Sequence, residues 1–347
     1  MATTLVIRLS SLGDIAITIP VLYSLAKKYP DDHFLMLTRS AWQSIFVNKP
    51  SNVTIFPVDT TDRHKGIIGI VRLLHELAPV IQTKEVKVAD LHGVVRSFLI
   101  DCYFRLKGKP VAIIDKGRKE KRELIRRKHK IMKPLKTTVD RYREVFEKLG
   151  YDSSLCFTGL FSEKPMKKQI RIGIAPFAKH KGKTYPLEQM EEVVRRLNES
   201  LNLQITLWGS PQERGCLENW TEKYRNATSV AGKMPLQDEL VLMNQMDVMV
   251  SMDSANMHLA SLVNTPVVSI WGATHPHLGF YGFNQSESNA VQTDLPCRPC
   301  STFGKKPCYR GDYACLKQIA PEKIVEKIET YFKLRARRMA FVPNLVD

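Results

Sequence analysis

The amino-acid sequence predicts an α/β protein in which two domains, each built on a doubly wound parallel sheet, face each other across a cleft. Short apolar stretches rich in branched residues alternate with helical patterns along most of the 347 residues. A polar, proline-containing stretch at 161–168 interrupts this alternation, and a fresh strand pattern follows it. In each half, one strand pattern runs directly into a helical pattern through a short turn, at 10–14 and at 253–256. Two such halves suit an enzyme that joins two substrates.

The first half opens with an expected strand at 5–9, the turn at 10–14 and a helix. Further strands are expected at 33–38, 53–57, 86–91 and 111–114, and further helices at 41–47, 66–77, 94–106 and 138–149. Gly150 ends the last helix, as a glycine often does. These elements predict an N-terminal domain at 1–160.

The second half repeats the alternation. Strands are expected at 170–175, 204–207, 248–252 and 266–270, and helices from 187, near 213 and 237, from 255 and from 321. They predict a C-terminal domain at 169–330. Residues 331–347 are expected to form a basic helix or tail, which could pack back on the N-terminal domain.

The composition is that of a folded protein without a membrane span. Hydrophobic residues make up 44% and charged residues 25%, which excludes a disordered chain. No apolar run approaches the roughly 20 residues that a membrane-spanning helix needs, and no cleavable leader is apparent. We therefore expect a cytoplasmic protein.

Positive charge is concentrated in one segment. Residues 116–136 contain eleven Lys or Arg against Glu120 and Glu123, which gives +9 of the formal net charge of +17. Such a segment could meet nucleic acid, an anionic membrane surface or an acidic substrate, or could be a solvated loop. It contains no Phe, Trp or Tyr on which bases could stack, and this counts against nucleic acid.

Four of the seven cysteines lie close together in the sequence. They are Cys297, Cys300, Cys308 and Cys315. A Cys-x2-Cys pair with two further thiols could hold zinc, although the second pair lacks the spacing of a zinc ribbon. Reduced or partly paired structural cysteines are the alternative.

The turn at 253–256 is typical of an anion site. A buried strand that leads directly into a helix presents unpaired N–H groups and the positive end of the helix dipole, and phosphate is the ligand expected there. The turn at 10–14 lies at the carboxyl end of the first strand, where open α/β sheets bind ligands. It contains only Gly13, so the three-glycine dinucleotide fingerprint is absent and an oxidoreductase is weakly supported.

Five motifs in order give the sequence a resemblance to a known family. They are Arg8-Leu-Ser-Ser-Leu-Gly-Asp-Ile15, Asp90-Leu-His-Gly-Val-Val-Arg-Ser97, Lys183-Thr-Tyr-Pro186, Asp253-Ser-Ala-Asn-Met-His258 and Trp271-Gly-Ala-Thr-His-Pro276. Over nearly the whole chain, the sequence resembles the heptosyltransferases, which build the lipopolysaccharide core of Gram-negative bacteria. The resemblance implies a GT-B fold with two Rossmann-like domains. The Cys-rich segment is also similar to one found in many members.

The resemblance also implies roles for single residues. Asp14 would be the general base, Lys183 would bind the donor's phosphates, and Asp253, Ser254, Ala255 and His258 would form the donor turn. The family's usual Thr-Gly reads Ser254-Ala255 here, which keeps a hydroxyl and a small residue. Thr274 and His275 could line the donor pocket. Arg127, and less strongly Arg96, would hold an anionic acceptor.

Two of these roles have structural alternatives. Asp14 could simply cap the helix that follows it, because Asp is a preferred capping residue. His258 lies one helical turn after Ser254 and could donate to a phosphate or serve only packing. No pair of metal-binding aspartates lies near the donor turn, so we expect transfer that requires no metal and no cofactor.

The sequence thus predicts an inverting glycosyltransferase that moves a heptose from an ADP-sugar to the lipopolysaccharide inner core. The expected partners are this nucleotide-sugar, the anionic acceptor and, reversibly, the cytoplasmic leaflet of the inner membrane, with no nucleic acid. A nucleic-acid-binding protein that uses the basic segment and the cysteines is one alternative, and a nucleotide-dependent oxidoreductase is another.

Overall fold

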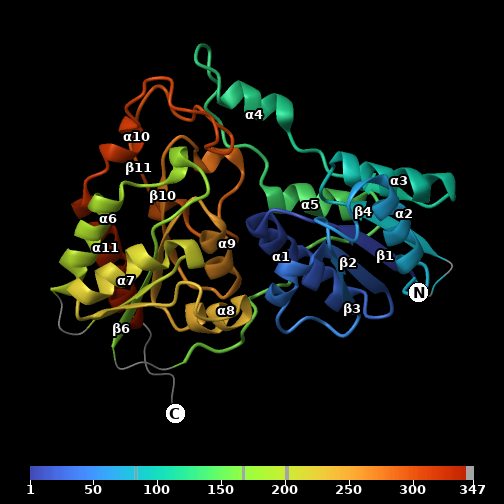
Figure 1. Ribbon diagram of the computed structural model, residues 1–347, viewed down its shortest axis with the longest axis horizontal. Coiled ribbons are helices and arrows are strands. Elements are labelled where there is room, and N and C mark those ends of the chain that lie inside the picture. The colour runs from blue at the N-terminus through green and yellow to red at the C-terminus, as the bar shows by residue number, and fades with distance from the viewer. Residues whose placement is uncertain (82, 84, 166–168, 200–202, 341–347) are drawn as a thin grey trace.

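Two α/β halves lie side by side in the computed structural model (Figure 1). The structure describes residues 1–81, 83, 85–165, 169–199 and 203–340, with the backbone only at 333–340. Each half contains one parallel sheet flanked by helices. The predicted fold class is therefore confirmed.

The first sheet has five strands in the order β3-β2-β1-β4-β5. They are β1 (Thr3–Ile7), β2 (His33–Arg39), β3 (Val53–Val58), β4 (Val86–Asp90) and β5 (Val111–Ile113), all paired in parallel. The strand order reverses between β1 and β4. In open α/β sheets this switch point opens a crevice at the carboxyl ends of the strands.

The second sheet has six strands in the order β11-β10-β9-β6-β7-β8. They are β6 (Ile170–Ala175), β7 (Leu203–Leu207), β8 (Ala227–Ser229), β9 (Val248–Met252), β10 (Val267–Trp271) and β11 (Ala290–Gln292), again all parallel. The switch point lies between β6 and β9. Strands β8 and β11, each three residues long, were not predicted.

The outer face of each sheet is covered by its own helices. On the first sheet these are α2 (Gly66–Leu77) and α3 (Val95–Leu106), whose apolar side chains pack on the strands. On the second sheet they are α6 (Leu187–Asn198), α7 (Arg214–Lys223) and α11 (Pro321–Ala340). Each outer layer is a separate hydrophobic core.

The inner faces share one core. Helices α1 (Leu12–Lys28) and α5 (Thr138–Glu147) come from the first half, and α8 (Leu236–Asn244) and α9 (Ala255–Leu262) come from the second. Their buried apolar residues form a single cluster that crosses from one half to the other, and α1 packs directly against α9. Burial of this surface on both sides holds the halves together. The turns that begin α1 and α9 therefore meet across this core.

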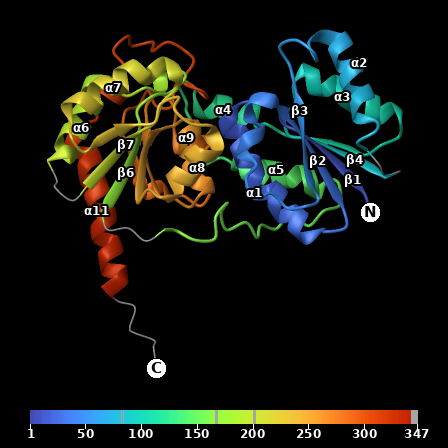
Figure 2. The same ribbon diagram turned by 60° about the horizontal axis from the view of Figure 1, so that its bottom comes forward.

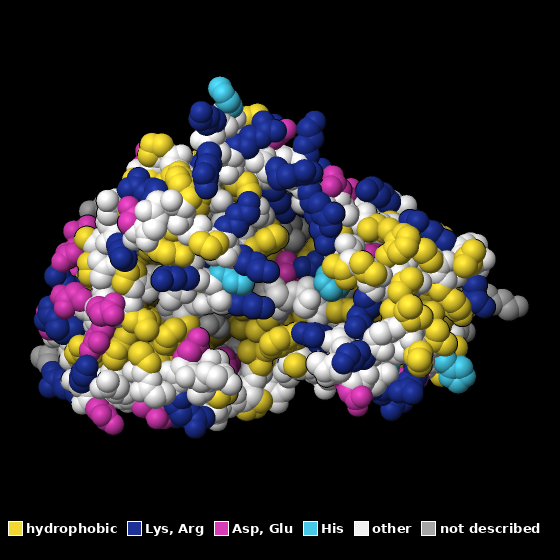
Figure 3. All heavy atoms as spheres, turned by 45° about the horizontal axis from the view of Figure 1, so that its top comes forward, with side chains coloured by type: hydrophobic (Ala, Val, Ile, Leu, Met, Phe, Trp, Pro, Cys, Tyr) yellow, Lys and Arg dark blue, Asp and Glu magenta, His cyan; other side chains and the backbone are white. Residues whose placement is uncertain are grey.

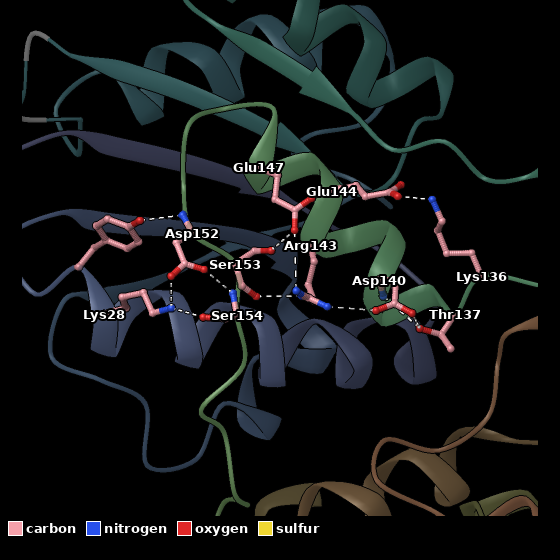
Figure 4. A network of polar contacts seen from close by, with 11 residues as sticks. Lys28, Lys136, Thr137, Asp140, Arg143, Glu144, Glu147, Asp152, Ser153 and Ser154 are labelled. Atoms are coloured by element: carbon pink, nitrogen blue, oxygen red, sulfur yellow. Dashed lines mark hydrogen bonds and ion pairs between the residues drawn. The ribbon is translucent and has the colours of Figure 1, made fainter.

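A network of ion pairs and hydrogen bonds fixes α5 to the body of the first half (Figure 4). Lys28 on α1 pairs with Asp152 at 2.6 Å, and the Ser153 hydroxyl donates to Glu147 on α5 at 2.6 Å. Arg143 donates to the Ser153 carbonyl at 2.9 Å. These contacts are mostly exposed, so their role is positional rather than a large source of stability.

The basic segment at 116–136 is largely exposed, but it is more than a solvated loop. It contains α4 (Arg118–Leu124), and residues 125–137, here called the strap, cross to the second half. The Leu135 N–H donates to the His277 carbonyl at 2.9 Å, and the Lys130 ammonium donates to the Cys297 and Pro299 carbonyls, both at 2.9 Å. The strap therefore connects the two halves.

The C-terminal helix α11 runs without a break from Pro321 to Ala340 (Figure 2). Its contacts are with α6, β10 and β11 of the second half. The basic side chains at 333–338 lie outside the described side chains, so packing of this tail on the N-terminal domain stays a prediction. Among the residues described, no helix is both long and apolar enough to cross a membrane.

Candidate active site

Asp14 lies at the switch point of the first sheet, in the first turn of α1. The Asp14 carboxylate oxygen Oδ2 accepts from the Ser11 N–H at 3.1 Å and the Ser11 hydroxyl at 2.7 Å, and it pairs with Arg8 at 2.7 Å. Asp14 is thus the third residue of the helix in a capping box, and Ser11 is the N-cap. No contact among the described residues uses Oδ1, and the side chain is 25% exposed. Capping and proton transfer can therefore be served by different oxygens of one carboxylate.

The charge of Asp14 is fixed by its surroundings. Burial alone would raise the pKa of the carboxyl, but the Arg8 guanidinium and the two Ser11 donors outweigh burial and hold the pKa below its ordinary value. Arg8 is itself held by a hydrogen bond to the Leu91 carbonyl at 2.6 Å. Asp14 is therefore ionised at neutral pH.

The turn after β4 lies beside this carboxylate. The buried Asp90 accepts from the His92 and Gly93 N–H groups at 2.7 and 2.9 Å, which shapes the turn. The His92 ring contacts the Ser10 hydroxyl at 3.4 Å. Burial, together with the nearby Arg8 and other cations, lowers the pKa of His92 to about 3. His92 is thus a neutral imidazole near the candidate base.

A cavity of about 440 Å³ opens next to Asp14, between the two halves. Its lining comes from the switch point of the first sheet, from α4 and α5, and from loops of the second half. The lining residues are Arg8, Asp14, Ile114, Lys116, Arg118, Lys121, Arg122, Thr138, Arg141, Tyr142, Phe280, Thr302 and Phe303. Lys and Arg side chains also gather around the hollow between the halves in Figure 3.

The charge of this cavity favours an anionic ligand. Six basic side chains line it and Asp14 is its one acidic lining residue, although Arg141 is also paired with Glu120 at 2.6 Å. The Lys121 ammonium lies 4.3 Å from the centre of the Phe280 ring, a cation–π contact between the two halves. Burial, helped by Arg141, lowers the pKa of Lys121 to about 8. An anion bound here would stabilise these cations and so compensate for the solvation that they lose on burial.

The predicted donor turn forms the switch point of the second sheet. Strand β9 ends at Met252, and Ser254 is the N-cap of α9. The Ser254 side chain makes no capping hydrogen bond and lies 3.2 Å from the Ser251 hydroxyl instead. The N–H groups of the first turn of α9 are therefore open to a ligand, as an anion site requires.

Lys183 reaches this turn from the neighbouring strand. It ends a short 3-10 helix, η2 (Lys181–Lys183), after β6, and its ammonium pairs with the Asp253 carboxylate at 2.7 Å. Asp253 is 3% exposed and Lys183 is 15% exposed. The structure thus brings Lys183 to the donor turn. The Lys183 ammonium is more exposed than its partner Asp253, so a phosphate bound at the turn could reach it.

His258 lies where the two turns meet. A Cβ atom added to Gly13 would lie 2.8 Å from Cδ2 of the His258 ring, so only glycine fits at this crossing of α1 and α9. Burial lowers the pKa of His258 to about 4, and Lys183 adds to this while Asp253 and Asp14 oppose it. His258 is therefore a neutral hydrogen-bonding group, and its Nδ1 has no partner among the described residues.

The loop after β10 forms the remaining wall beside the donor turn. Thr274 is fully buried, and no described residue hydrogen-bonds its hydroxyl. The buried Arg298 donates to the carbonyls of Gly272 at 2.6 Å and Thr274 at 3.0 Å, which organises this loop. The Ala273 N–H donates to the Gly182 carbonyl at 2.8 Å and joins the loop to η2. The donor-turn residues and Thr274 do not line the basic cavity, so this cavity and the donor turn are separate regions.

The two arginines predicted for the acceptor lie elsewhere. Arg96 donates to the His64 carbonyl just before α2, and Arg127 lies 4.2 Å above the Tyr309 ring in the second half. Neither lines the cavity. Their predicted role is untested, while the basic residues that do line the cavity were not individually predicted.

The four clustered cysteines are all free thiols. In the part of the chain that the structure describes, no group of three or more His, Cys, Asp or Glu side chains could hold a metal ion. The present arrangement of Cys297, Cys300, Cys308 and Cys315 therefore does not fit a metal, and we derive no step of the chemistry through one.

This combination of two facing Rossmann-like sheets, a carboxylate on one and an anion turn on the other, defines the class of protein. The family model for glycosyltransferase family 9 (heptosyltransferase) matches residues 88–308. The chain belongs to this family and is a glycosyltransferase with the GT-B fold. Nothing in the matches supports the nucleic-acid-binding or the oxidoreductase alternative.

Individual relatives are similar over nearly their whole length. Lipopolysaccharide heptosyltransferase 1 of Pseudomonas aeruginosa is 25% identical, over 94% of this chain and 96% of its own. The structure of a family 9 glycosyl transferase from Veillonella parvula has a TM-score of 0.75 and 19% identity, and covers 96% of this chain and 98% of its own. The structure of the E. coli heptosyltransferase WaaC with ADP-2-deoxy-2-fluoro heptose has a TM-score of 0.66 and 19% identity, and covers 94% of this chain and 99% of its own.

Proposed function

We propose that this protein transfers a heptose from an ADP-linked donor to an anionic acceptor in the lipopolysaccharide inner core, with inversion at the anomeric carbon. The observation that carries the proposal is the meeting of Asp14 and the donor turn at the Gly13–His258 crossing, beside a cavity lined with cations. The names of the relatives support the sugar and the acceptor class, and the ADP-sugar analogue bound by WaaC supports the nucleotide.

In the proposed reaction, the acceptor hydroxyl lies in the basic cavity with its proton directed at Asp14 Oδ1. As the hydroxyl oxygen forms a bond to the anomeric carbon, Asp14 takes its proton, and the bond between that carbon and the diphosphate oxygen breaks. The electron pair of this bond leaves with ADP. Attack from the face opposite the diphosphate inverts the anomeric configuration. Arg8 holds Oδ2 and so orients the carboxylate.

Positive groups at the donor turn would stabilise the departing diphosphate. The Lys183 ammonium and the open N–H groups of α9 supply charge where negative charge grows during the reaction. The free hydroxyl of Thr274 and the neutral His258 are further donors near the turn. We propose that these groups suffice without a metal ion, so activity should survive incubation with a chelator.

The cavity cations would hold the acidic groups of the acceptor. Part of the basic segment lines the cavity and part joins the two halves, so the remaining exposed cations, including Lys119, Lys128 and Lys133, are left for an anionic membrane surface. Each could add about 1 kcal/mol of attraction there. We propose that the protein works at the cytoplasmic leaflet of the inner membrane, to which it binds reversibly.

The proposal is tested by incubating the purified protein with ADP-heptose and a heptose-free core acceptor. Mass spectrometry should show a gain of one heptose, and NMR of the product should show the inverted anomeric configuration. Thermal shift with ADP, GDP, UDP and CDP supplies a separate test of the donor site. ADP should give the largest stabilisation, and the Lys183→Ala, Asp253→Ala double variant should lose it.

Two results would contradict the assignment. One is the absence of product with every nucleotide-heptose and core acceptor tried. The other is equal stabilisation of the wild type and the double variant by ADP, which would place the nucleotide outside the donor turn.

A further inference from the structure

The outer surface of the N-terminal half carries an exposed apolar patch. Ile67, Ile68 and Val71 on α2 are 73%, 79% and 62% exposed, and Val95 and Phe98 on α3 are 80% and 51% exposed. The other face of α2 is apolar too, but it is buried against the sheet. Figure 3 shows hydrophobic side chains gathered over this half, with basic side chains at their border. A soluble protein rarely exposes such a surface unless something binds it.

This apolar patch lies at the carboxyl edge of the first sheet. Both α2 and α3 begin at the carboxyl edge of the first sheet, and Arg96 on α3 donates to the His64 carbonyl just before α2. The starts of the two helices are thus tied together. They lie at the same edge of the sheet as the Asp14 turn, because all strands of this sheet are parallel.

A second cavity lies between the apolar patch and the basic cavity. It measures about 490 Å³ and is lined by Asp90, Gly93, Val94, Val95, Phe98, Asp101, Ile113 and Arg118. Val95 and Phe98 belong to the patch, and Arg118 lines both cavities. The second cavity therefore lies next to the basic cavity that contains Asp14, with Arg118 between them.

The charges around the patch favour an anionic partner. Exposed basic residues on and next to the two helices include Lys65, Arg72, Arg105 and Lys107. On the acidic side, Glu76 is already paired with Arg63 at 2.8 Å, and Asp62 is exposed. Basic α4 and the strap lie on the same side of the molecule in Figure 3. Apolar side chains bordered by cations match the surface of an anionic bilayer.

We propose that the apolar patch on α2 and α3 inserts into the interfacial layer of an anionic membrane. The acceptor's lipid stays in the bilayer while its sugar end passes through the second cavity to Asp14. Only this route for the acceptor depends on the proposed function. Insertion itself needs no substrate and depends on the exposed side chains alone.

Flotation of the full-length protein with vesicles of phosphatidylethanolamine and phosphatidylglycerol tests the proposal without substrate. The triple variant Ile67→Ser, Ile68→Ser, Val71→Ser should partition into vesicles at least about tenfold more weakly than the wild type, because it removes most of the apolar surface of α2. Val95→Ser on α3 should weaken binding independently. Val241→Ser, which changes a residue on α8 that is 46% exposed, is the matched control and should bind like the wild type. Unchanged thermal unfolding of each variant shows that the fold is kept.

Transfer assays separate the surface from the reaction. The triple variant should act normally on a water-soluble acceptor without acyl chains and poorly on vesicle-embedded acceptor. Wild-type-like partitioning of the triple variant would overturn the proposal. A second result would also overturn it. If sedimentation showed that the wild type is a dimer and the triple variant a monomer, while both bind vesicles equally, the patch would be covered by a second copy of the chain. If the protein transfers nothing to any acceptor while the flotation result holds, only the proposed function fails.

Discussion

At the scale of single residues, the site depends on charges whose partners determine what they can do. The Asp14 carboxylate is kept ionised by Arg8 through one oxygen, which leaves the other for a substrate. His258 and His92 are uncharged instead, because burial lowers the pKa of both imidazole rings. A neutral imidazole can donate to a phosphate without competing with Lys183 for it. The family resemblance pointed to Asp14, Lys183 and the donor turn, but no sequence pattern revealed the partner of each.

We expect Lys121 to make acceptor binding depend on pH. Its pKa in the free protein is about 8, so the ammonium is charged below this pH and loses its charge as pH rises through it. If Lys121 holds an acidic group of the acceptor, the KM for the acceptor should rise by about tenfold above this pH. Steady-state kinetics across the pH range measures this.

Lys121→Arg is the matched variant for this prediction, because arginine stays charged throughout the range. Its KM should stay flat where that of the wild type rises. The same rise in both proteins would show that Lys121 does not contact the acceptor.

At the scale of elements, the crossing of α1 and α9 determines the distance between the base and the donor turn. The strands and helices that lead into both turns were predicted from apolar periodicity, because β1 and β9 are fully buried and their helices follow at once. The crossing itself was not predicted. It depends on a contact between Gly13 and His258, which are 245 positions apart in the chain. No local pattern reports such a contact. The strap was missed for the same reason, because its partners lie in the second half.

Gly13→Ala tests this crossing. The added methyl group would lie 2.8 Å from the His258 ring and 3.6 Å from the Ala255 backbone, so α1 must move away from α9. We expect kcat to fall by about a hundredfold, since a small misplacement of reacting groups is costly. Stopped-time product assays measure kcat.

Gly215→Ala on α7 provides the control, because a methyl group there meets nothing within 4 Å. It should leave kcat unchanged and slightly stabilise the helix. Equal kcat values for the two variants would mean that the crossing does not position the catalytic groups.

At the scale of the whole molecule, the shared inner core makes the two halves one unit around the site. The two sheets and their parallel pairing followed from the sequence, because each strand pattern was followed by a helix. The strand orders, and with them the switch points, were not predicted. The basic cavity was not predicted either, because its lining comes from both halves and from loops without periodicity. Arg8, Lys121 and Phe280 are together only in the folded chain.

Acid should lower the free energy of unfolding of the protein before its carboxylates titrate. His258 has a pKa of about 4 when folded and about 6.5 when unfolded, so the unfolded state binds the extra proton between these values. The free energy of unfolding should therefore fall as pH drops through this window, by about 3 kcal/mol for His258. Burial also lowers the pKa of His275, to about 4, so His275 should act in the same direction. Denaturant titrations at several pH values measure the effect.

His258→Gln should flatten this pH dependence, since glutamine does not titrate. His75→Gln, a change at an exposed position on α2, is the control and should leave the slope unchanged. Parallel slopes for the wild type and His258→Gln would contradict the prediction.

The central claim is that Asp14 is the base of an inverting transfer, and kcat of the Asp14→Asn variant tests it most directly. The amide keeps the size of the side chain but cannot accept the proton, so we expect kcat to fall by about 10²- to 10⁴-fold, with ADP affinity and fold retained. Ser11→Ala, which weakens the same capping box at a cost of about 1 kcal/mol of stability, should lower kcat far less. A kcat for Asp14→Asn within a few-fold of the wild type would contradict the account and leave Asp14 as a helix cap.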